Sequence, residues 1–454
     1  MTVQVRPELY AVNVRRFGAT GDGTTDDTAA IQAAIDAAPA GARITVPAGV
    51  YKFSALTVDD SKTLAGTGWR CLRDAVEAFA DADYATAANF TGSILRSTAS
   101  SGTAITVVTT GETIQGHLED LCVIGPGSGT AVGVKVGTTI RAVVNPVWRN
   151  VMVCNFASGV QMLNINDGQF DSLIIRGCTT GLALSVSTNN NLFNMLDIQR
   201  CVTGLTDDST CLANLFNAPL FQGNTGTSAV LTGSNIVLQT PYFENASGVR
   251  AVDMTGGQAI VIHSPRLAGT GNESIRVGSG VFAAQIIAPT AGAATAIDIL
   301  AGANGTLVIG DLTSSITVND AGTNTTYLDT RGNRSKLPAV QTGLLLDALA
   351  SGQFNLTFRD ATTSKWSIRK INASGNLIIY DDVNARTLAQ FAPGATSILS
   401  GFIVSGVIGM GSSVTGSRPN AANFAAGGMW YDTTLSIPIW TDGTVWRDAA
   451  GTAV

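Results

Sequence analysis

The sequence predicts an all-β protein built as a right-handed, single-stranded parallel β-helix with coils of about 23 residues. Short β-branched segments repeat, and three well-matched copies begin at Val147, Phe170 and Phe193. Landmark glycines at 159, 181 and 204 recur 22 and 23 residues apart. The 50 glycines against 13 prolines indicate many tight turns between short strands. A period in the low twenties is too short for paired helices, which leaves a stacked β-solenoid.

A column of cysteines follows the same period. Cys154, Cys178 and Cys201 are 24 and 23 residues apart. Because parallel crossovers are right-handed and neighbouring coils lie about 4.8 Å apart, a column in the alignment becomes a ladder in space. We interpret this column as an inward ladder of small apolar side chains, in preference to a disulfide between coils.

Residues 1–40 are predicted to form an N-terminal arm and a capping helix. Glycines at 18, 21 and 23 make a tight loop, and residues 25–27 are placed to supply the N-cap oxygens of the following helix. This helix is expected to cover the open end of the solenoid, where backbone groups would otherwise be unpaired. A phosphate-binding loop is disfavoured, because Gly21-Asp-Gly23 is followed by acidic residues.

The same segment carries a family resemblance. The run Phe17-Gly-Ala-Thr-Gly-Asp-Gly-Thr-Thr-Asp-Asp-Thr-Ala-Ala-Ile-Gln32, followed by Val46-Pro-Ala-Gly-Val-Tyr51, resembles the entry motif of the pectate-lyase-like right-handed β-helix superfamily. That superfamily includes bacteriophage tailspikes as well as pectinases. The resemblance covers roughly residues 12–330 and implies the fold, but it says little about the reaction.

Residues 41–330 are predicted to form the β-helix itself, with one interruption. Residues 71–80 have a helical composition and residues 81–91 are loop-like. We expect this insertion to stand on the flank of the solenoid, where loops commonly carry binding function.

Two smaller modules are predicted to follow. Residues 331–405 are expected to form an antiparallel β module, because the segments 354–360, 365–371, 376–381 and 386–391 alternate apolar and polar residues. This module resembles one found near the distal ends of phage tail fibres and spikes.

Residues 406–454 form a C-terminal Trp-rich motif, which resembles a hairpin-like terminal motif of phage tail proteins. Three tryptophans and a tyrosine lie between residues 430 and 446. Such a cluster can serve as a sugar-stacking surface, as a local core or as a seam between subunits. We favour a structural role.

Composition excludes several classes of function. The net charge is −6 and Lys and Arg are scattered, which argues against nucleic-acid binding. The chain has no run of 18 apolar residues and no signal-peptide hydrophobic segment, so neither membrane insertion nor general secretion is expected. Six cysteines without CxxC spacing and two histidines predict neither a metal site nor another cofactor.

Partners are inferred mainly from the resemblance. Spikes of this kind associate as homotrimers, and the alanine-rich, charge-poor run 281–312 would suit a flank that meets another chain. Attachment to a particle is expected through residues 1–12, which would bind a particle adaptor or a tail or head protein.

Cleavage of a polysaccharide by hydrolysis would need two carboxylates from neighbouring coils. Glu244 is the first candidate, because it sits at a turn beside Tyr242 and resembles the Tyr-Phe-Glu turn of many superfamily members. Arg200 and Arg266 are its expected column neighbours within one residue of register. Arginines on both sides would lower its pKa, so a salt-bridged ladder is favoured over a general acid.

Asp171 and Asp197, 26 residues apart, form the next candidate catalytic pair, with Asn194 near the first in the column. Outward carboxylates on strands are also ordinary surface groups. A lyase would use His263 or Lys135 as the base, and hydrolysis is favoured over elimination. The candidate substrate-binding residues are Trp148, Arg200, Tyr242 and Arg266.

The sequence therefore predicts a receptor-binding spike that recognises bacterial cell-surface polysaccharide, either capsule or lipopolysaccharide. The alternative is a polysaccharide depolymerase on the same spike, and a free pectinase-like enzyme is disfavoured. We expect the protein to be made in the bacterial cytoplasm and to reside on the surface of a virion or phage-like particle.

Overall fold

The computed structural model describes residues 11–59, 61–71, 90–107, 116–246, 248–269, 274–310, 316–329, 335–336, 355–360, 363–370, 377–381, 386–391, 412–423 and 426–454. Contacts divide the chain into two units, residues 1–345 and 346–454. The predicted insertion lies outside the described residues over 72–89, as do residues 1–10 of the arm.

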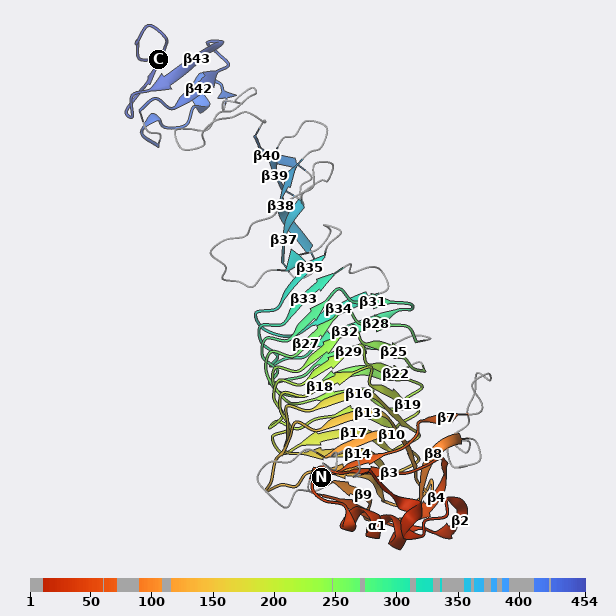
Figure 1. The fold of residues 1–454 in the computed structure, drawn as a ribbon. Helices are drawn as coiled ribbons and strands as arrows, with labels where there is room; N and C mark the ends of the chain where they lie inside the picture. The colour runs from red at the N-terminus through yellow and green to blue at the C-terminus, as the bar shows by residue number, and fades with distance from the viewer. Residues whose placement is uncertain are drawn as a thin grey trace, which may run out of the picture. The chain divides into compact units, whose positions relative to one another are not determined.

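The first unit is a stack of parallel strands, which confirms the predicted all-β parallel solenoid (Figure 1). A 23-stranded sheet and an 11-stranded sheet run along it, with a two-stranded sheet beside them. The large sheet contains β1 (Ala11–Asn13), β2 (Asp22–Asp26), β3 (Arg43–Thr45), β4 (Gly49–Phe53), β6 (Thr63–Ala65), β7 (Trp69–Cys71), β8 (Phe90–Ser97), β10 (His117–Ile124), β13 (Val147–Cys154), β16 (Gln169–Arg176), β18 (Leu192–Asn194), β19 (Asp197–Gln199), β21 (Leu215–Asn217), β22 (Leu220–Gln222), β24 (Val237–Gln239), β25 (Tyr242–Glu244), β27 (Val261–His263), β28 (Arg266–Leu267), β30 (Gln285–Ile287), β31 (Thr290–Ala291), β33 (Leu307–Gly310), β35 (Thr326–Asp329) and β36 (Ser335–Lys336). The second sheet contains β5 (Leu56–Val58), β9 (Thr103–Val107), β11 (Val132–Val136), β14 (Ser158–Leu163), β17 (Thr180–Ser185), β20 (Thr203–Thr206), β23 (Ala229–Leu231), β26 (Arg250–Met254), β29 (Ser274–Val277), β32 (Thr295–Ile299) and β34 (Ile316–Asp320), and the small sheet pairs β12 (Val143–Val144) with β15 (Ile165–Asn166).

Each coil turns a corner within the large sheet at a residue with a left-handed backbone. Ser172, Met195, Ala218 and Thr240 occupy this corner in successive coils, with φ between 47° and 55°. Residues other than Gly, Asn and Asp adopt this conformation at a cost, so the stacking of coils must offset it. The corner separates strands such as β18 and β19, which then face different directions.

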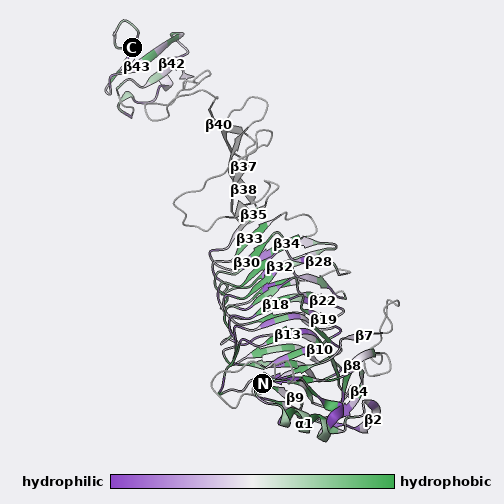
Figure 2. Cartoon of the chain, in the orientation of Figure 1, coloured by the Kyte–Doolittle hydropathy of each residue, from purple (hydrophilic) through white to green (hydrophobic). Residues whose placement is uncertain are grey.

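The core is a ladder of large side chains stacked in register. Trp148, Phe170, Phe193 and Phe216 follow one another across β13, β16, β18 and β21. Phe193 stacks between Phe170 and Phe216, with ring centroids 4.7 Å apart on both sides. Figure 2 shows the hydrophobic segments on the strands of successive coils. Burying one aromatic ring per coil holds the register of the stack.

The cysteine column is only partly as predicted. Cys178 and Cys201 are buried in the main core, and each interacts with the other. Cys154 instead pairs in register with Ile124 and Arg176 and lies in a separate buried cluster with Cys122. The prediction of one ladder was wrong for Cys154, because its position on β13 turns the side chain to the opposite face of the strand. The buried residues Cys122, Cys154, Cys178, Cys201 and Cys211 are free thiols.

The helix α1 (Thr28–Ala37) forms at the N-terminal end of the coils, preceded by the 3-10 turn η2 (Val14–Phe17) (Figure 1). Ile31, Ala34 and Ile35 bury its inner face in the core. Asp27 occupies the N-cap position but makes no side-chain cap bond. Its carboxylate accepts hydrogen bonds from the backbone N–H groups of Thr20 and Gly21, so it fastens the glycine loop instead.

The second unit contains two four-stranded sheets. An antiparallel meander runs over the predicted segments as β37 (Asn355–Asp360), β38 (Thr363–Lys370), β39 (Leu377–Asp381) and β40 (Arg386–Phe391). The C-terminal sheet contains β41 (Ser412–Ser413), β42 (Met429–Asp432), β43 (Ile437–Thr441) and β44 (Trp446–Arg447), with short turns η4 (Thr415–Ser417) and η5 (Ala421–Asn423). We call residues 412–454 the C-terminal module.

Candidate functional site

Polar side chains line one outer face of the solenoid after the corner. Along β16, β19, β22 and β25 the buried residues Ile175, Ile198, Phe221 and Phe243 point inward, and their neighbours on both sides are partly exposed. Figure 1 shows β19, β22, β25 and β28 following one another along this side. We call the following residues the polar ladder: Arg176, Asp197, Gln199, Gln222, Tyr242, Glu244 and Arg266.

Contacts divide the polar ladder into two groups. Arg176 and Asp197 form an ion pair with 3.0 Å between Nη2 and Oδ2. One coil beyond Gln199, Gln222 donates from Nε2 to Oε2 of Glu244 over 2.9 Å. The hydroxyl of Tyr242 donates to the same oxygen over 3.0 Å. Both groups therefore hold their polar atoms in fixed positions at the surface.

Two members of the polar ladder have pKa values above their ordinary values. Burial raises the pKa of Asp197, although the Arg176 guanidinium acts in the opposite direction. Among the described residues, its second oxygen, Oδ1, is buried and has no hydrogen-bond partner. Burial also raises the pKa of Tyr242, and the hydrogen bond to Glu244 adds to this effect.

Asp197 and Glu244 are too far apart in register to act as a hydrolytic pair. Asp197 lies opposite Leu220, which lies opposite Tyr242, and Glu244 is two residues further along its strand. Two coils and two residues separate their Cα atoms by about 12 Å at ordinary strand spacings. Carboxylate pairs need about 5 Å for retention and about 6.5–9.5 Å for inversion.

The predicted pair of Asp171 and Asp197 is not brought together. Asp171 lies opposite Asn194 on β18, whose Nδ2 donates to it over 2.7 Å. Asp197 lies opposite Ile174, beyond the corner at Ser172. The two carboxylates thus stand on different faces of the coil, and a sequence separation of 26 does not match one turn here.

Trp148 was wrongly predicted to bind substrate. Its side chain is fully buried, meets Phe170 edge-on at 5.6 Å, and donates from Nε1 to the Gly116 carbonyl oxygen over 3.0 Å. Trp148 occupies an inward position of the column that Phe170 and Phe193 continue. The alternation along β13 determines this direction, which the residue type alone does not reveal.

The two predicted arginine neighbours of Glu244 lie elsewhere. The register partner of Glu244 is Gln222, and Arg266 lies opposite Tyr242. Arg200 occupies the next corner, with φ of 54°, and lines a surface pocket of about 280 Å³. Its lining includes Asn155, Phe156, Cys178, Thr179, Val202 and Thr225. Arg200 follows Gln199 directly, so the pocket adjoins one edge of the polar ladder.

The sequence analysis missed Arg176 and Gln222. Each stands in the column of outward positions that also holds Gln199 and Glu244. Strict alternation with the inward residues Ile175 and Phe221 is the signal that identifies them. His263, the candidate base of a lyase, has its Nδ1 within 3.2 Å of Gln239 Nε2 and 3.1 Å of Ser264 Oγ.

Neither a metal cluster nor a membrane-spanning helix occurs in the part of the chain that the structure describes. No three His, Cys, Asp or Glu side chains gather there as a metal site would need. No helix in those ranges is both long and apolar enough to span a membrane.

Comparison with known proteins identifies the fold. Residues 11–205 match the family model described as rhamnogalacturonase A/epimerase, pectate lyase-like. The enzymatically active domain of bacteriophage CBA120 tailspike protein 2 superposes with a TM-score of 0.51 at 14% identity, over 69% of this chain and 52% of that one. Residues 11–205 are thus similar to the pectate-lyase-like family, and the chain folds as a parallel β-helix.

Curated relatives match this β-helix protein over short segments. An exo-poly-alpha-D-galacturonosidase of Dickeya chrysanthemi is 57% identical over 53 residues, which is 12% of this chain and 9% of the relative. Mannuronan C5-epimerase AlgE3 of Azotobacter vinelandii is 50% identical over 66 residues, 12% of this chain and 4% of the relative. The chain spans less than a tenth of the length of these relatives.

Proposed function

We propose that the chain is the receptor-binding spike of a phage or phage-like particle, and that its polar ladder binds a bacterial cell-surface polysaccharide, either capsule or lipopolysaccharide. The observation that carries this proposal is the placement of seven polar side chains on one outer face over consecutive coils. Coils spaced about 4.8 Å apart present a repeating surface to a repeating polymer. The Tyr242 ring adds an apolar contact beside the hydrogen-bonding groups.

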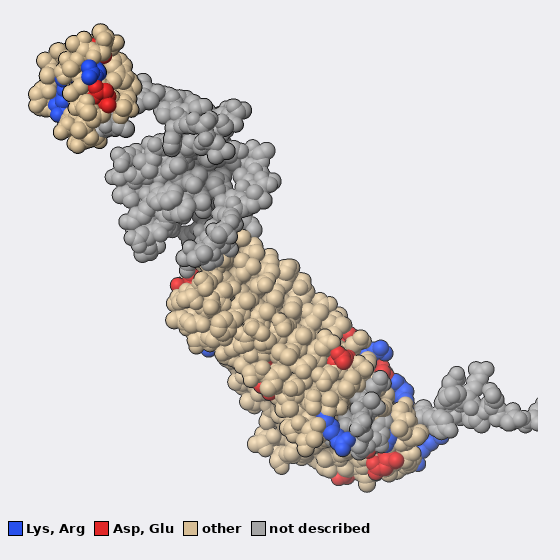
Figure 3. Space-filling view, turned by 90° about the vertical axis from the view of Figure 1, so that its left-hand side faces the viewer, with Lys and Arg blue, Asp and Glu red and all other residues tan. Residues whose placement is uncertain are grey.

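The spike is proposed to be a homotrimer on the particle surface. Figure 3 views the left-hand flank of Figure 1 and shows a broad area over the later coils without charged side chains. Leu212, Leu215 and Phe282 are exposed by 43%, 38% and 51%. Contact with second and third copies would cover such side chains. Attachment is proposed through residues 1–12, which would meet an adaptor or another tail or head protein.

A depolymerase is the second candidate, and Asp197 favours it. A buried carboxyl with a raised pKa is suited to donate a proton to a leaving sugar oxygen. Glu244 is about 12 Å away by register, and we propose that an adjacent chain supplies the second carboxylate. Cleavage would then depend on assembly, whereas binding by the ladder would not.

The test compares ladder variants in polysaccharide binding. We expect Gln222→Ala and Tyr242→Ala to weaken binding about tenfold, because each removes a ladder contact and loosens Glu244. Gln285→Ala is the matched control, since Gln285 is an outward glutamine on β30 outside the ladder. Equal binding by all three variants would contradict the assignment.

Cleavage is tested on the same samples by size analysis and a reducing-end assay. Shortened chains would establish a depolymerase, and Asp197→Asn, Glu244→Gln and Asp171→Asn would then test the three candidate acids. Unshortened polysaccharide that remains bound would establish the non-cleaving spike. Polygalacturonate and alginate belong in the panel, because the relatives named above are a poly-galacturonosidase and a mannuronan epimerase.

A further inference from the structure

The C-terminal module contains a surface pocket of its own. The pocket encloses about 400 Å³, which lies within the range of about 300–1,000 Å³ typical of small-molecule sites. It is formed by the end of β43, the following turn and the chain beyond β44. Its lining consists of Trp440, Thr441, Asp442, Arg447, Asp448, Ala449 and Gly451.

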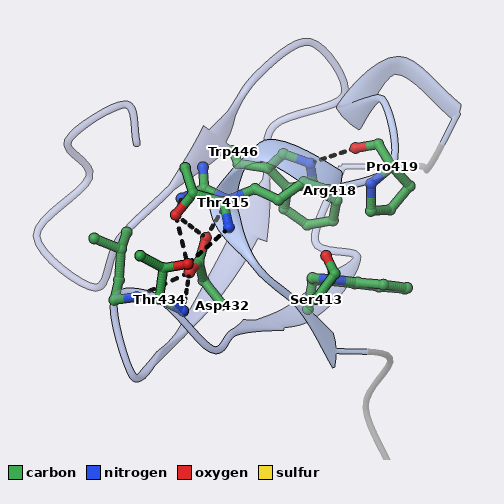
Figure 4. A network of polar contacts seen from close by, with 9 residues as sticks. Ser413, Thr415, Arg418, Pro419, Asp432, Thr434 and Trp446 are labelled. Carbon is green, nitrogen blue, oxygen red and sulfur yellow. Dashed lines mark hydrogen bonds and ion pairs between the residues drawn. The ribbon is translucent and has the colours of Figure 1, made fainter.

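Trp440 differs from the other two tryptophans of the C-terminal module. Trp446 is buried and donates from Nε1 to the Pro419 carbonyl oxygen over 2.8 Å (Figure 4). Trp430 packs against it with ring centroids 6.4 Å apart, and donates to Ser413 Oγ over 3.0 Å. These two rings form the local core. Trp440 is half-buried on the opposite face of β43, between its cross-strand neighbours Met429 and Arg447.

The Trp440 ring is therefore not required by the core, and its face borders a pocket. Among the described residues its indole nitrogen makes no hydrogen bond. An aromatic ring with an apolar face and an unused polar tip is the usual platform for the apolar face of a sugar ring. The structure thus supports a local core for two of the tryptophans and a ligand contact for the third.

The charged side chains at the pocket are held in place by the protein. Arg447 donates from Nε to Oδ2 of Asp442 over 2.6 Å, and from Nη1 to the Gly451 carbonyl oxygen over 2.9 Å. The other Asp442 oxygen accepts backbone hydrogen bonds from the turn that follows it. Asp448 accepts two more from Ala450 and Thr452. Fixed carboxylates accept from sugar hydroxyls, and a fixed guanidinium donates to them.

A network around Asp432 also holds the sheet of the C-terminal module in place. Asp432 is fully buried and pairs with Arg418, while Thr415 Oγ1 donates to it over 2.9 Å (Figure 4). The backbone N–H groups of Thr434 and Leu435 donate to the same carboxylate. This network ties β42 and its turn to the segment before it. Because such contacts already fix the sheet that carries the pocket, ligand binding costs little conformational entropy there.

We propose that this pocket binds one neutral pyranose residue of a polysaccharide, stacked on Trp440, with its hydroxyls bonded to Asp442, Arg447 and Asp448. A neutral sugar is preferred over a uronate, because two carboxylates against one guanidinium leave the pocket net negative. This site goes beyond the proposed function of the polar ladder and does not rest on it. The chain would carry two separate glycan sites, one in each unit.

The experiment uses the full chain and simple probes. Methyl glycosides of glucose, galactose and mannose are titrated against it, with galacturonate as the charged counterpart, and binding is measured by saturation-transfer NMR. We expect at least one neutral glycoside to bind and galacturonate to bind more weakly. Trp440→Ala is expected to weaken neutral binding about tenfold, and Trp440→Phe less.

Two control variants distinguish sugar binding in this pocket from binding elsewhere on the chain. Met429→Ala changes the same sheet face outside the pocket and should leave binding unchanged, and so should Gln285→Ala on β30 of the solenoid. Failure of the ladder variants to affect polysaccharide binding would leave this proposal intact. The proposal is overturned if no neutral glycoside binds at millimolar concentration, or if Trp440→Ala and Trp440→Phe both bind as the parent chain does. It is also overturned if Trp440→Ala lowers the oligomer mass, because the pocket face would then be a seam between subunits.

Discussion

Asp207 makes the stability of the solenoid depend on pH in a direction opposite to that of most acids. The residue is 9% exposed at the end of β20, and its Oδ1 accepts the backbone N–H groups of Thr232 and Gly233. Within the described residues, Oδ2 is buried and has no partner. Burial raises the pKa of Asp207 to about 6 from an ordinary value of 3.8. The folded chain thus binds this proton more tightly than the unfolded chain.

The sign and size of the effect follow from this difference. A group whose pKa is raised on folding stabilises the fold at low pH, and that stabilisation is lost as pH rises from about 4 through 6. At 1.36 kcal/mol per pKa unit, the loss amounts to about 3 kcal/mol. Asp207→Asn keeps an oxygen for Thr232 and Gly233 and carries no charge at any pH. The free energy of unfolding of the variant, minus that of the parent chain, should therefore increase by about 3 kcal/mol between pH 4 and pH 8.

The assay is equilibrium denaturant unfolding followed by circular dichroism at five pH values. Subtracting the parent chain at each pH removes the contribution of every other titrating group. Asp208→Asn is the matched control, because hydrogen bonds from Thr210 and Val186 outweigh the effect of burial and hold the pKa of Asp208 below its ordinary value. That variant should be less stable than the parent chain above pH 4, with little further change up to pH 8. A flat difference for Asp207→Asn across this range would refute the reasoning.

Three further predictions concern packing, corners and the C-terminal module. Phe193→Ala should lower the free energy of unfolding by about 4 kcal/mol, since it empties the ring stack on both sides, and Phe193→Leu by only about 1.5 kcal/mol, since leucine refills most of the space. A cost of less than about 1 kcal/mol for Phe193→Ala would contradict this account of the core. Met195→Asn should raise the free energy of unfolding by about 0.5–1 kcal/mol. The Met195 side chain is 66% exposed and therefore gains little from burial, and asparagine adopts its backbone φ of 54° at a lower cost than methionine. A lower denaturation midpoint for that variant would contradict the corner argument. Asp432→Ala should destabilise the C-terminal module by about 3–5 kcal/mol, since it leaves Arg418 buried without its carboxylate; unchanged unfolding by tryptophan fluorescence would show the network to be dispensable.

The sequence predicted the solenoid because each sequence repeat forms one coil of it. Phe170 and Phe193 align in the sequence and stack in the structure, since one coil adds one rung of fixed length. Antiparallel strands over residues 355–391 followed equally from alternation. Both features depend on the order of apolar and polar residues within short segments, which can be seen in a single sequence.

The direction of individual side chains was less predictable. Trp148 and Cys154 lie on one strand, and the first points into the main core while the second points away from it. A shift of one residue in the alignment reverses such an assignment. The same shift paired Glu244 with arginines and overlooked Gln222. Corners add to the problem, because a left-handed residue such as Ser172 changes the face on which the next carboxylate stands.

The distribution of polar and apolar side chains over the solenoid places binding and assembly on different surfaces. The polar ladder ends near Arg266, and beyond it the outward position of β31 is occupied by Thr290. Over the same coils Phe282 is half exposed, and charged side chains are sparse (Figure 3). Exposed apolar surface with few charges is costly in water unless another chain covers it. The polar ladder lies on β19, β22, β25 and β28, on the right-hand side of the solenoid in Figure 1 and away from this left-hand flank, so a second chain on the flank would leave the ladder open. Covering the flank would therefore not block the polar ladder, and the oligomeric state of the protein is a measurement separate from its polysaccharide binding.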